Sequence, residues 1–575
     1  MFHSLNVKSL FIRGCVERFS KPTVFSSAKC MWSSSGNIVR SSYPDIEISK
    51  LSLSNYLLEN VKDYVDKPAV TCGASGRTYN YGEVQFMTDR LAKAFRAIRA
   101  CNLRKNDTLG ILLPNMPEFT PVVLGANKAG LKITFANPLY TPEEILRQFE
   151  VAKVKIMVTI PSLLPVSNFL KAKMEGYRGT ICIGGKDDLD NNVFNFESLI
   201  KTDHIADLPT ISPKDIAIIP FSSGTSGLPK GVLLTNENCV ANLCQITSPP
   251  FNRYAHEECE NKNVLSIPPF FHIYGFNGIL NLTLRNGAHL ISLPKFSPED
   301  YIRSLVTYEP SVLFLVPSLM LFLASHPSVT KKMLEPVAEV LVGAAAATVQ
   351  LQEKFRSKCV ENIVIRQGYG MTEASPVTLL TPFKPDESKL GSTGQLLPNM
   401  EARIVSTEDG TVLGMNETGE LQFRGPQVMK GYLNNEAATK DTLDEDGWLK
   451  TGDIGYYDSD YYFYIVDRCK ELIKVKGNQV SPTELENIIA EIDGIADVAV
   501  VGIPDDLAGE LPRAYVVLKH NSKLNKHDII SYIQQKCIKY KWLEGGVKIV
   551  KAIPRNHSGK ILRNELRSLD QKGDK

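Results

Sequence analysis

Long hydrophobic runs are missing from this sequence of 575 residues. No stretch of about 20 apolar residues occurs, and a helix needs about that length to cross a bilayer, so we expect no transmembrane helix. The nearest candidate, residues 312–324, is too short and contains Pro317, and we interpret it as part of a core. A net charge of only +2 gives no general basic field for nucleic acid or an anionic membrane surface.

Paired cysteines are missing as well. The eleven cysteines are odd in number and scattered, and no Cys-x-x-Cys motif occurs. This pattern predicts reduced thiols in a reducing compartment, because disulfide frameworks and zinc sites need paired or closely spaced cysteines. The composition, 43% hydrophobic and 22% charged, is typical of a globular protein, and the length predicts several domains or subdomains.

Acidic residues are almost absent before Asp45, where only Glu17 occurs. The same stretch is rich in serine and contains Lys8, Arg13, Arg18, Lys21, Lys29 and Arg40. This composition is typical of a mitochondrial transit peptide, so we expect residues 1–37 to be a leader that directs the protein to the mitochondrial matrix. The alternative is an extension without a targeting role, and hence a cytoplasmic protein. The final residues, 572–575, are not a peroxisomal Ser-Lys-Leu ending.

Apolar β-rich runs alternate with helical periodicity through the first 400 residues. Strands are expected at 108–113, 155–159, 264–268, 289–293 and 312–316, and helices at 81–100, 142–151 and 298–308. This alternation predicts an α/β fold with layered, parallel sheets. Residues 393–467 change to short strands and Gly-rich turns, which predicts a smaller β unit.

A compact α+β pattern follows the charged residues at 470–471, with helices expected at 482–492 and 526–537 and strands at 496–503 and 514–518. We therefore expect the chain to consist of three parts: a leader (1–37), a large N-terminal domain (38–468) and a small, mobile C-terminal domain (469–575).

The densest local signal is the segment 222–231, Ser-Ser-Gly-Thr-Ser-Gly-Leu-Pro-Lys-Gly. Glycines let a backbone approach an anion closely, hydroxyl and N–H groups donate to phosphate oxygens, and Lys230 adds a positive charge. An apolar run at 216–221 predicts a buried strand leading into this loop. The sequence thus predicts a polyphosphate site at a strand end, with a flexible linker as the alternative. It is not a Walker A motif, because Pro229 precedes the lysine.

With its flanks, the segment 220–232 resembles the signature of the adenylate-forming superfamily, which contains acyl- and aryl-CoA synthetases, luciferases and peptide-synthetase adenylation domains. Three further motifs occur in the family's order: Pro-Phe-Phe-His-Ile-Tyr at 269–274, Gln-Gly-Tyr-Gly-Met-Thr-Glu at 367–373 and Asp-Arg-Cys-Lys-Glu-Leu-Ile-Lys at 467–474. The resemblance spans about Pro44 to Arg567 and looks closest to 4-coumarate–CoA ligase-like enzymes.

The resemblance implies an ATP-dependent carboxylate–CoA ligase. Hydroxide is a poor leaving group, so the acid is first activated as an acyl-adenylate with release of pyrophosphate, and coenzyme A then displaces AMP. Such a site needs Mg²⁺, donors to phosphate and a nucleotide pocket. The implied ligands are a small carboxylic acid, ATP, Mg²⁺ and coenzyme A, with no nucleic acid.

By resemblance, Tyr369 stacks on adenine, Thr372 contacts phosphate, Glu373 carries Mg²⁺ and Asp453 binds the ribose. From the residues alone, a Gly-Tyr-Gly turn before a helix-capping threonine, and a structural aspartate in a turn, stay open as alternatives. The implied nucleotide-binding set is Ser222, Ser223, Gly224, Thr225, Ser226, Lys230, Gln367, Gly368, Tyr369, Thr372, Asp453, Arg468, Lys470, Lys474 and Lys560.

Lys560, in the segment 554–563, matches the family lysine that reaches the α-phosphate and the carboxylate, although most lysines near a C-terminus are simply solvated. His272 is implied as a gate near the carboxylate, although a histidine among aromatics is more often core. The implied catalytic set is Lys560, His272, Thr372 and Glu373. Lys470 matches the family's hinge, and Lys474 a residue that faces the site after the small domain turns.

The acid is implied to contact His272, Tyr274, Gly343, Ala344, Ala345 and Gln479, and coenzyme A to contact Lys295, Lys476 and Gly477. An apolar aryl or medium-to-long acyl tail is favoured by the residues expected to border the pocket, which are Tyr274, Leu315, Val316, Ser318, Met320 and Ala345. Ala346 stands where the family commonly has proline, so the local turn is expected to differ.

Two functions are alternatives to the ligase. One is a luciferase-like oxygenase, which uses the same adenylate, and the other is a catalytically silent binding protein. The joint presence of Lys230, Glu373, Asp453, Arg468 and Lys560 argues against the silent protein. A peptide-synthetase module is not expected, since no carrier domain follows Lys560.

A variant that begins at Asn37 is predicted to keep catalytic activity and to lose mitochondrial import, because the family-like region starts later in the chain. Activity of the purified variant and the location of a tagged form in cells test the two halves separately. A cytosolic full-length protein, or a folded but inactive variant, would contradict the prediction.

Overall fold

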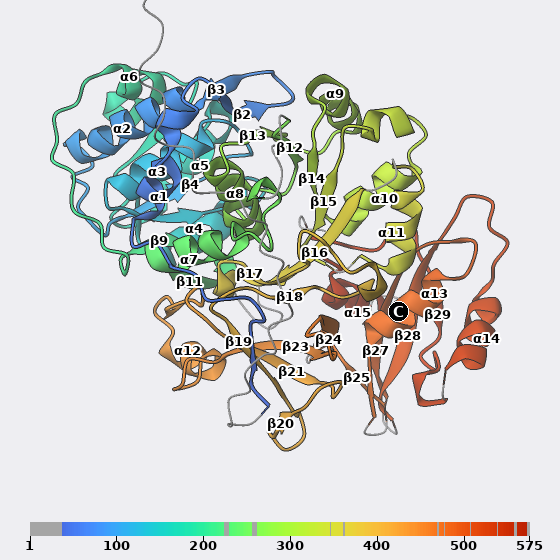
Figure 1. The fold of residues 1–575 in the computed structure, drawn as a ribbon. Helices are drawn as coiled ribbons and strands as arrows, with labels where there is room; N and C mark the ends of the chain where they lie inside the picture. Colours follow the sequence, from blue (N-terminus) through green and yellow to red (C-terminus); the bar gives the residue numbers. More distant parts are fainter. Residues whose placement is uncertain are drawn as a thin grey trace, which may run out of the picture. The chain divides into compact units, whose positions relative to one another are not determined.

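The computed structural model describes residues 37–222, 229–255, 261–345, 347–359, 363–468, 471–475, 478–505, 508–537, 539–556 and 560–571. The unit formed by residues 37–575 contains four β-sheets in this described part (Figure 1). Among the same residues, no helix is both long and apolar enough to cross a membrane.

The first sheet carries the predicted phosphate loop at one edge. In spatial order its strands are β10 (Phe221–Ser222), β11 (Lys230–Thr235), β9 (Ile216–Ile219), β5 (Lys132–Phe135), β4 (Thr108–Ile111), β6 (Val154–Thr159), β7 (Gly179–Cys182) and β8 (Val193–Asn195), and β22 (Gly431–Tyr432) pairs with β11. The strands from β9 to β8 run parallel. Their near-continuous apolar sequences fit a parallel sheet that is covered on both faces.

The second sheet carries the Gln-Gly-Tyr-Gly motif. In spatial order it contains β18 (Gln395–Leu396), β17 (Val377–Leu380), β16 (Val364–Gly370), β15 (Glu339–Val342), β14 (Val312–Leu315), β12 (Asn263–Ser266), β13 (His289–Ser292), β2 (Pro68–Cys72) and β3 (Thr78–Asn80). The strands from β16 to β2 are parallel, so the carboxyl ends of β14, β15 and β16 meet at one edge. Ligands of α/β sheets bind outside such edges.

The third sheet is antiparallel and corresponds to the predicted β unit at 393–467. Its order is β1 (Val39–Arg40), β19 (Glu401–Val405), β21 (Gly419–Arg424), β23 (Leu449–Tyr457) and β24 (Phe463–Arg468), with β20 (Val412–Leu413) beside β19. The sequence did not predict β1, which is contributed by the residues just after the leader region.

The fourth sheet belongs to the small C-terminal domain. It contains β26 (Asn478–Val480), β25 (Ile473–Val475), β28 (Gly509–Leu518) and β27 (Ile495–Asp505), with β29 (Val547–Ile549) beside β28. Residues such as Ile473, Val500, Val516 and Ile533 form an apolar cluster within this part of the chain. Its own core and sheet confirm a small α+β domain, while its first residue, 469, stays a prediction.

Helices form where the sequence provides both an apolar face and a cap. Thr141 and Glu144 form a reciprocal capping box at the start of the helix 142–152, which has proline in its first turn. The α-helices are α1 (Leu53–Leu58), α2 (Tyr81–Ala97), α3 (Phe119–Lys128), α4 (Pro142–Ala152), α5 (Leu164–Lys173), α6 (Phe196–Lys201), α7 (Asn236–Ile246), α8 (Leu282–Arg285), α9 (Pro298–Tyr308), α10 (Pro317–Ser325), α11 (Val349–Arg356), α12 (Glu436–Thr442), α13 (Pro482–Ala490), α14 (Lys526–Lys536) and α15 (Arg563–Gln571).

The predicted α/β class is confirmed, and the predicted elements occur within a few residues of their expected bounds. The main differences lie at element ends. The helix expected at 81–100 ends at Ala97, because Ile98 takes extended backbone. The strand expected at 514–518 begins earlier, at Gly509, because β28 pairs along the length of β27.

Candidate active site

The base of the predicted phosphate loop is a two-strand hairpin. Ser222 in β10 lies opposite Lys230 in β11, and the antiparallel pair brackets the loop. Ser223, Gly224, Thr225 and Ser226 lie outside the described residues. The strand expected at 216–221, before the loop, is observed as β9 and β10, and β10 pairs with β11, which follows the loop.

Lys230 is connected to Glu373 through an aromatic side chain that the sequence analysis missed. The Lys230 ammonium lies 4.7 Å from the centroid of the Tyr432 ring. The Tyr432 hydroxyl donates a hydrogen bond of 2.8 Å to Glu373 Oε1. Tyr432 therefore aligns the predicted phosphate-binding lysine with the predicted metal-binding carboxylate. Its short strand, β22, has no periodicity that would single it out in the sequence.

The Gly-Tyr-Gly motif lies in a strand and not in a turn, so the turn alternative is wrong. Gly368, Tyr369 and Gly370 form the end of β16, and the short 3₁₀ helix Thr372–Ala374 follows. Thr372 is its first residue, and the helix has no side-chain cap at its N-terminus. A Cβ atom at Gly370 would lie 2.0 Å from the carbonyl oxygen of Pro376, so only glycine fits.

Gln367 and the preceding arginine fix the end of β16. The Gln367 side-chain oxygen accepts from the Ala347 N–H at 2.9 Å, and its amide nitrogen donates to the Ser392 carbonyl at 3.2 Å. Arg366 forms a buried ion pair of 2.5 Å with Glu339 on β15. The Gln367 side chain is thus engaged with the protein backbone, which supports a role in positioning the strand end. Its nucleotide contact stays a prediction.

Asp453 is the buried centre of the site. It lies on β23 directly opposite Arg468 on β24, and Arg468 Nε is 3.1 Å from Asp453 Oδ1. The Tyr369 hydroxyl donates to the other oxygen, Oδ2, at 2.5 Å. Burial raises the pKa of Asp453, while Arg468, the Tyr369 hydroxyl and Lys560 oppose that shift. The structure thus brings together Tyr369, Asp453 and Arg468, three residues of the nucleotide-binding set that the resemblance implies.

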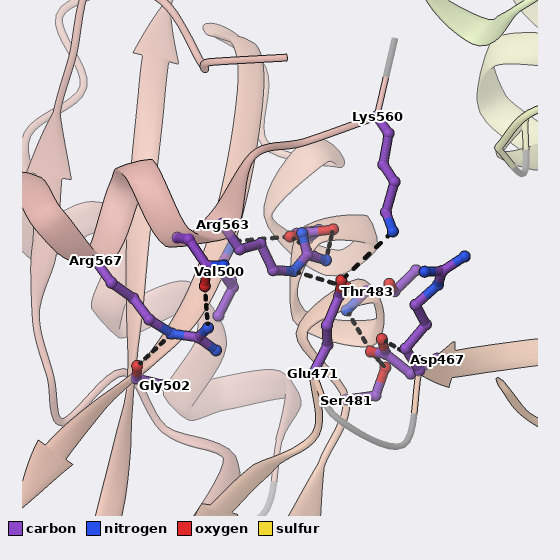
Figure 2. Close-up of polar contacts among 12 residues, drawn as sticks. Asp467, Glu471, Ser481, Thr483, Val500, Gly502, Lys560, Arg563 and Arg567 are labelled. Atoms are coloured by element: carbon purple, nitrogen blue, oxygen red, sulfur yellow. Dashed lines mark hydrogen bonds and ion pairs between the residues drawn. The ribbon is translucent and has the colours of Figure 1, made fainter. Parts of the chain in front are cut away.

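Lys560 reaches this centre from the small domain. Its ammonium lies 3.9 Å from Glu471 Oε1 (Figure 2). Burial lowers the pKa of Lys560 to about 8, and Arg468 acts in the same direction, whereas Glu471 and Asp453 raise it. Lys560 is therefore still mainly a cation at neutral pH, close enough to Asp453 for each charge to affect the other.

The predicted acyl pocket gathers at the carboxyl end of β15. The Tyr274 ring packs on Gly343, where a Cβ atom would lie 2.7 Å from Tyr274 Cζ. Ala344 has a positive φ of 68°, and it and Ala345 are exposed, while Ala346 lies outside the described residues. The Tyr274 hydroxyl is buried and has no hydrogen-bond partner among the described residues.

His272 lies beside the same pocket. Its Nδ1 accepts a hydrogen bond of 3.3 Å from the Tyr274 N–H, and Tyr274 starts the π-helix Tyr274–Asn281 that leads into α8. The residue retains some exposed surface, yet desolvation lowers its pKa to about 4. His272 is therefore neutral between pH 5 and 8, which suits a gate better than a base that titrates in that range.

The structure describes only some of the residues predicted to bind coenzyme A or to form the hinge. Lys295 is exposed after β13. The backbones of Lys474 and Gln479 face each other across β25 and β26. Lys470, Lys476 and Gly477 lie outside the described residues, as do the side chains of Lys474 and Gln479.

A carboxylate joins the two sides of the predicted hinge. Asp467, on β24, accepts hydrogen bonds from the Ser481 hydroxyl at 2.6 Å and from the Thr483 N–H at 3.1 Å, at the start of α13 (Figure 2). Ser481 also caps α13 through the Glu484 N–H. Asp467 thus fastens the first helix of the small domain to the last strand of the large one.

Family models match most of the chain. A model described as "AMP-binding enzyme" matches residues 57–433, and one described as "AMP-binding enzyme C-terminal domain" matches residues 484–560. A 4-coumarate–CoA ligase from Nicotiana tabacum is 38% identical over 538 residues, covering 92% of this chain and 97% of that protein. A probable 4-coumarate–CoA ligase from Dictyostelium discoideum is 36% identical over 545 residues, with the same two coverages, 92% and 97%.

Solved structures share the fold. ATP-bound MatB from Rhodopseudomonas palustris superposes with a TM-score of 0.81 at 25% identity, covering 92% of this chain and all (100%) of that one. An o-succinylbenzoate CoA synthetase from Bacillus subtilis, in complex with its acyl-adenylate, gives 0.76 at 27% identity, with coverages of 90% and 99%. The resemblance drawn from the motifs is confirmed across both domains.

Asp453→Ala is predicted to raise the Michaelis constant for ATP far more than it lowers the turnover number, because a ribose is held alike in ground and transition states. Losing a charge-assisted hydrogen bond costs about 1.5–3 kcal/mol, which corresponds to about 10- to 150-fold. Steady-state kinetics at varied ATP measure the effect.

Asp460→Ala is the matched control, since this carboxylate pairs with Lys389 near the same sheet and its side chain is 60% exposed. The control is expected to behave as the wild type. An unchanged Michaelis constant with a collapsed turnover number in Asp453→Ala would contradict the ribose assignment.

Proposed function

Because the chain belongs to the AMP-binding enzyme family, we propose that it joins a carboxylic acid to coenzyme A with consumption of ATP. The acid and ATP give an acyl-adenylate and pyrophosphate, and coenzyme A then gives the acyl-CoA and AMP. The observation that carries this proposal is the meeting of Tyr369, Asp453, Arg468 and Lys560 at one place. A silent binding protein has no need for a half-buried lysine beside a nucleotide site.

In the first step, the acid's oxygen attacks the α-phosphorus and negative charge develops on the phosphate. Among the described residues, the Lys560 ammonium and the Arg468 guanidinium are cations that act on Asp453, and they are placed to stabilise that charge. His272 stays neutral and orders the carboxylate entrance. Asp453 and Tyr369 orient the ribose and the base, so that the reacting atoms meet in one geometry.

Glu373 fits a magnesium ion that is shared with substrate. The residue is 5% exposed, and one oxygen of its carboxylate already accepts from Tyr432. A single carboxylate suits Mg²⁺, which binds through one or two carboxylates and completes its shell with phosphate oxygens and water. When bound, Mg²⁺ would supply charge neutralisation on the phosphates.

The pocket favours an aryl acid with a polar group at its far end over a plain fatty acid. Tyr274 provides an aromatic wall against Gly343, and its buried hydroxyl has no partner in the described part of the protein. A purely apolar tail would leave this hydroxyl unsatisfied at a cost of about 1–3 kcal/mol. The names of the relatives, 4-coumarate–CoA ligases, support a hydroxylated aryl acid such as 4-coumarate.

Pyrophosphate release across aromatic acids and C2–C18 fatty acids tests the proposal. We expect hydroxylated aryl acids to be preferred, and Tyr274→Phe to lower catalytic efficiency toward them about 5- to 150-fold while sparing unsubstituted analogues, because only the hydroxyl is removed. A preference for fatty acids would overturn the aryl assignment, and light emission with luciferin would favour the oxygenase. If no acid of the panel supports pyrophosphate release, the assignment as an enzyme is contradicted.

Lys560→Ala is predicted to lower adenylate formation about 10²–10³-fold, the usual loss for one such charge stabiliser. It should convert synthetic acyl-AMP and coenzyme A to thioester at a near-normal rate, because we propose that the small domain turns at Lys470 between the steps. Lys474→Ala is expected to show the reverse bias. Equal loss of both half-reactions in Lys560→Ala would contradict the alternation.

We also propose that residues 1–37 direct the protein to the mitochondrial matrix. The support is compositional: six basic residues, abundant serine and a single acid before Asp45. The described region begins at Asn37, and β1 starts two residues later. Removal of the leader therefore leaves the third sheet with all of its strands.

A further inference from the structure

Glu471 is enclosed by three cations that come from both sides of the predicted hinge. Lys560 Nζ is 3.9 Å from Glu471 Oε1, and Arg563 Nε is 3.3 Å from Glu471 Oε2 (Figure 2). Arg468, three residues earlier, is close enough for Glu471 to raise its pKa. The side chain is only 16% exposed, so water screens these charges weakly.

Glu471 is held in place by a chain of buried ion pairs. Arg563 begins α15, is 8% exposed, and also contacts Glu486 on α13 at 3.0 and 3.2 Å. Glu486 Oε1 accepts a further hydrogen bond of 2.8 Å from the Val500 N–H on β27. Arg563 is thus fixed by the core of the small domain, and it presents its Nε side to Glu471.

The two contacts of Glu471 differ in strength. The contact with Arg563 is the shorter and joins side chains that are 8% and 16% exposed, whereas the contact with Lys560 is long for an ion pair and involves a side chain that is 29% exposed. A carboxylate that is anchored on one side and loosely paired on the other can release the second partner at little cost. A phosphate oxygen of ATP is a stronger competitor for an ammonium group than a carboxylate 3.9 Å away.

We propose that Glu471 is a positioning residue for adenylate formation, which holds the Lys560 ammonium at the nucleotide site until a phosphate oxygen of ATP replaces it. This inference rests on the proposed function, because it assigns Lys560 to the first half-reaction. Glu471, Arg563 and Glu486 all follow Lys470, so the chain of ion pairs moves with Lys560 when the small domain turns.

The charges around Lys560 give the expected direction of the effect. Arg468 on β24 and Arg563 on α15 disfavour its protonated form, while Glu471 and Asp453 favour it, and burial lowers the pKa to about 8. Removing the charge of Glu471 therefore lowers the pKa of Lys560 further. Since the protonated form is the active one, activity is lost as pH rises through that pKa. Burial raises the pKa of Glu486 to about 7, so Glu486 is mostly ionised before Lys560 loses its proton.

The test compares Glu471→Gln with the wild type in the full-length protein, by ATP–pyrophosphate exchange between pH 6 and 10. We expect kcat/KM for ATP to fall about 5- to 10-fold at pH 8, with its alkaline limb shifted down by about one pH unit, the usual effect of one charge at this distance. The alkaline limb of kcat should stay in place, because bound ATP has then replaced Glu471. Thioester formation from synthetic acyl-AMP should stay within about twofold of the wild type.

Two variants separate this role from a merely structural one. Glu471→Asp keeps the charge, so the alkaline limb of its kcat/KM profile is expected close to the pH of the wild-type limb. Glu484→Gln neutralises another carboxylate of the small domain, one that pairs with Lys541 at 2.6 Å, and should leave both profiles unchanged.

The possible results separate this inference from the proposed function. An unshifted kcat/KM profile in Glu471→Gln overturns the inference, and so does an equal loss of both half-reactions in a variant that melts at the wild-type temperature. If Glu471→Gln does not fold, Glu471→Asp takes its place in the test. A lower kcat/KM with the alkaline limb at the wild-type pH supports the proposal, and an alkaline limb shifted down by about one pH unit overturns it. Absence of exchange in the wild type counts against the proposed function instead.

Discussion

One buried carboxylate, that of Asp453, holds the site together. It accepts from Tyr369 at the end of the second sheet and from Arg468 at the end of the third, and it lies within the field of Lys560 from the small domain. A buried anion is costly unless it is paired, so three separate parts of the chain are drawn to one point. Both oxygens of the carboxylate are engaged by these partners, one by Arg468 and the other by Tyr369.

The strand end that carries Tyr369 is itself secured from behind. Arg366, the third residue of β16, pairs with Glu339 in the interior, and its guanidinium also donates to the carbonyls of Thr381 and Phe251 at 2.8 and 2.9 Å. These bonds satisfy a charge that has no access to water. Because Gln367 is also bound on both sides, the register of β16 is fixed immediately before Gly368 and Tyr369, so the position of Tyr369 beside Asp453 is preorganised.

The sequence predicted the layers, the small domain and most residues of the centre, because these depend on local patterns: apolar runs, capping boxes and short motifs with fixed spacing. It missed features that depend on contacts between distant segments. The strand β1 pairs with β19 although 361 positions separate Arg40 from Glu401. Tyr432 lies in no periodic or Gly-rich pattern, and Glu471 lies in the motif at 467–474 but received no role from it. The roles of both residues follow from the lysines that they contact in the structure. Secondary structure depends largely on the local sequence, whereas charge neutralisation depends on contacts that form only in the folded chain.

The hydrogen bonds between Asp467 and the start of α13 affect the energetics of the proposed rotation of the small domain. The proposed turn of the small domain about Lys470 would separate this carboxylate from the Ser481 hydroxyl and the Thr483 N–H, so all three would regain water. The two proposed orientations would then differ in internal hydrogen bonding and in hydration. Conditions that alter the activity of water or screen the carboxylate, such as osmolytes and added salt, would act on the balance between them at this contact.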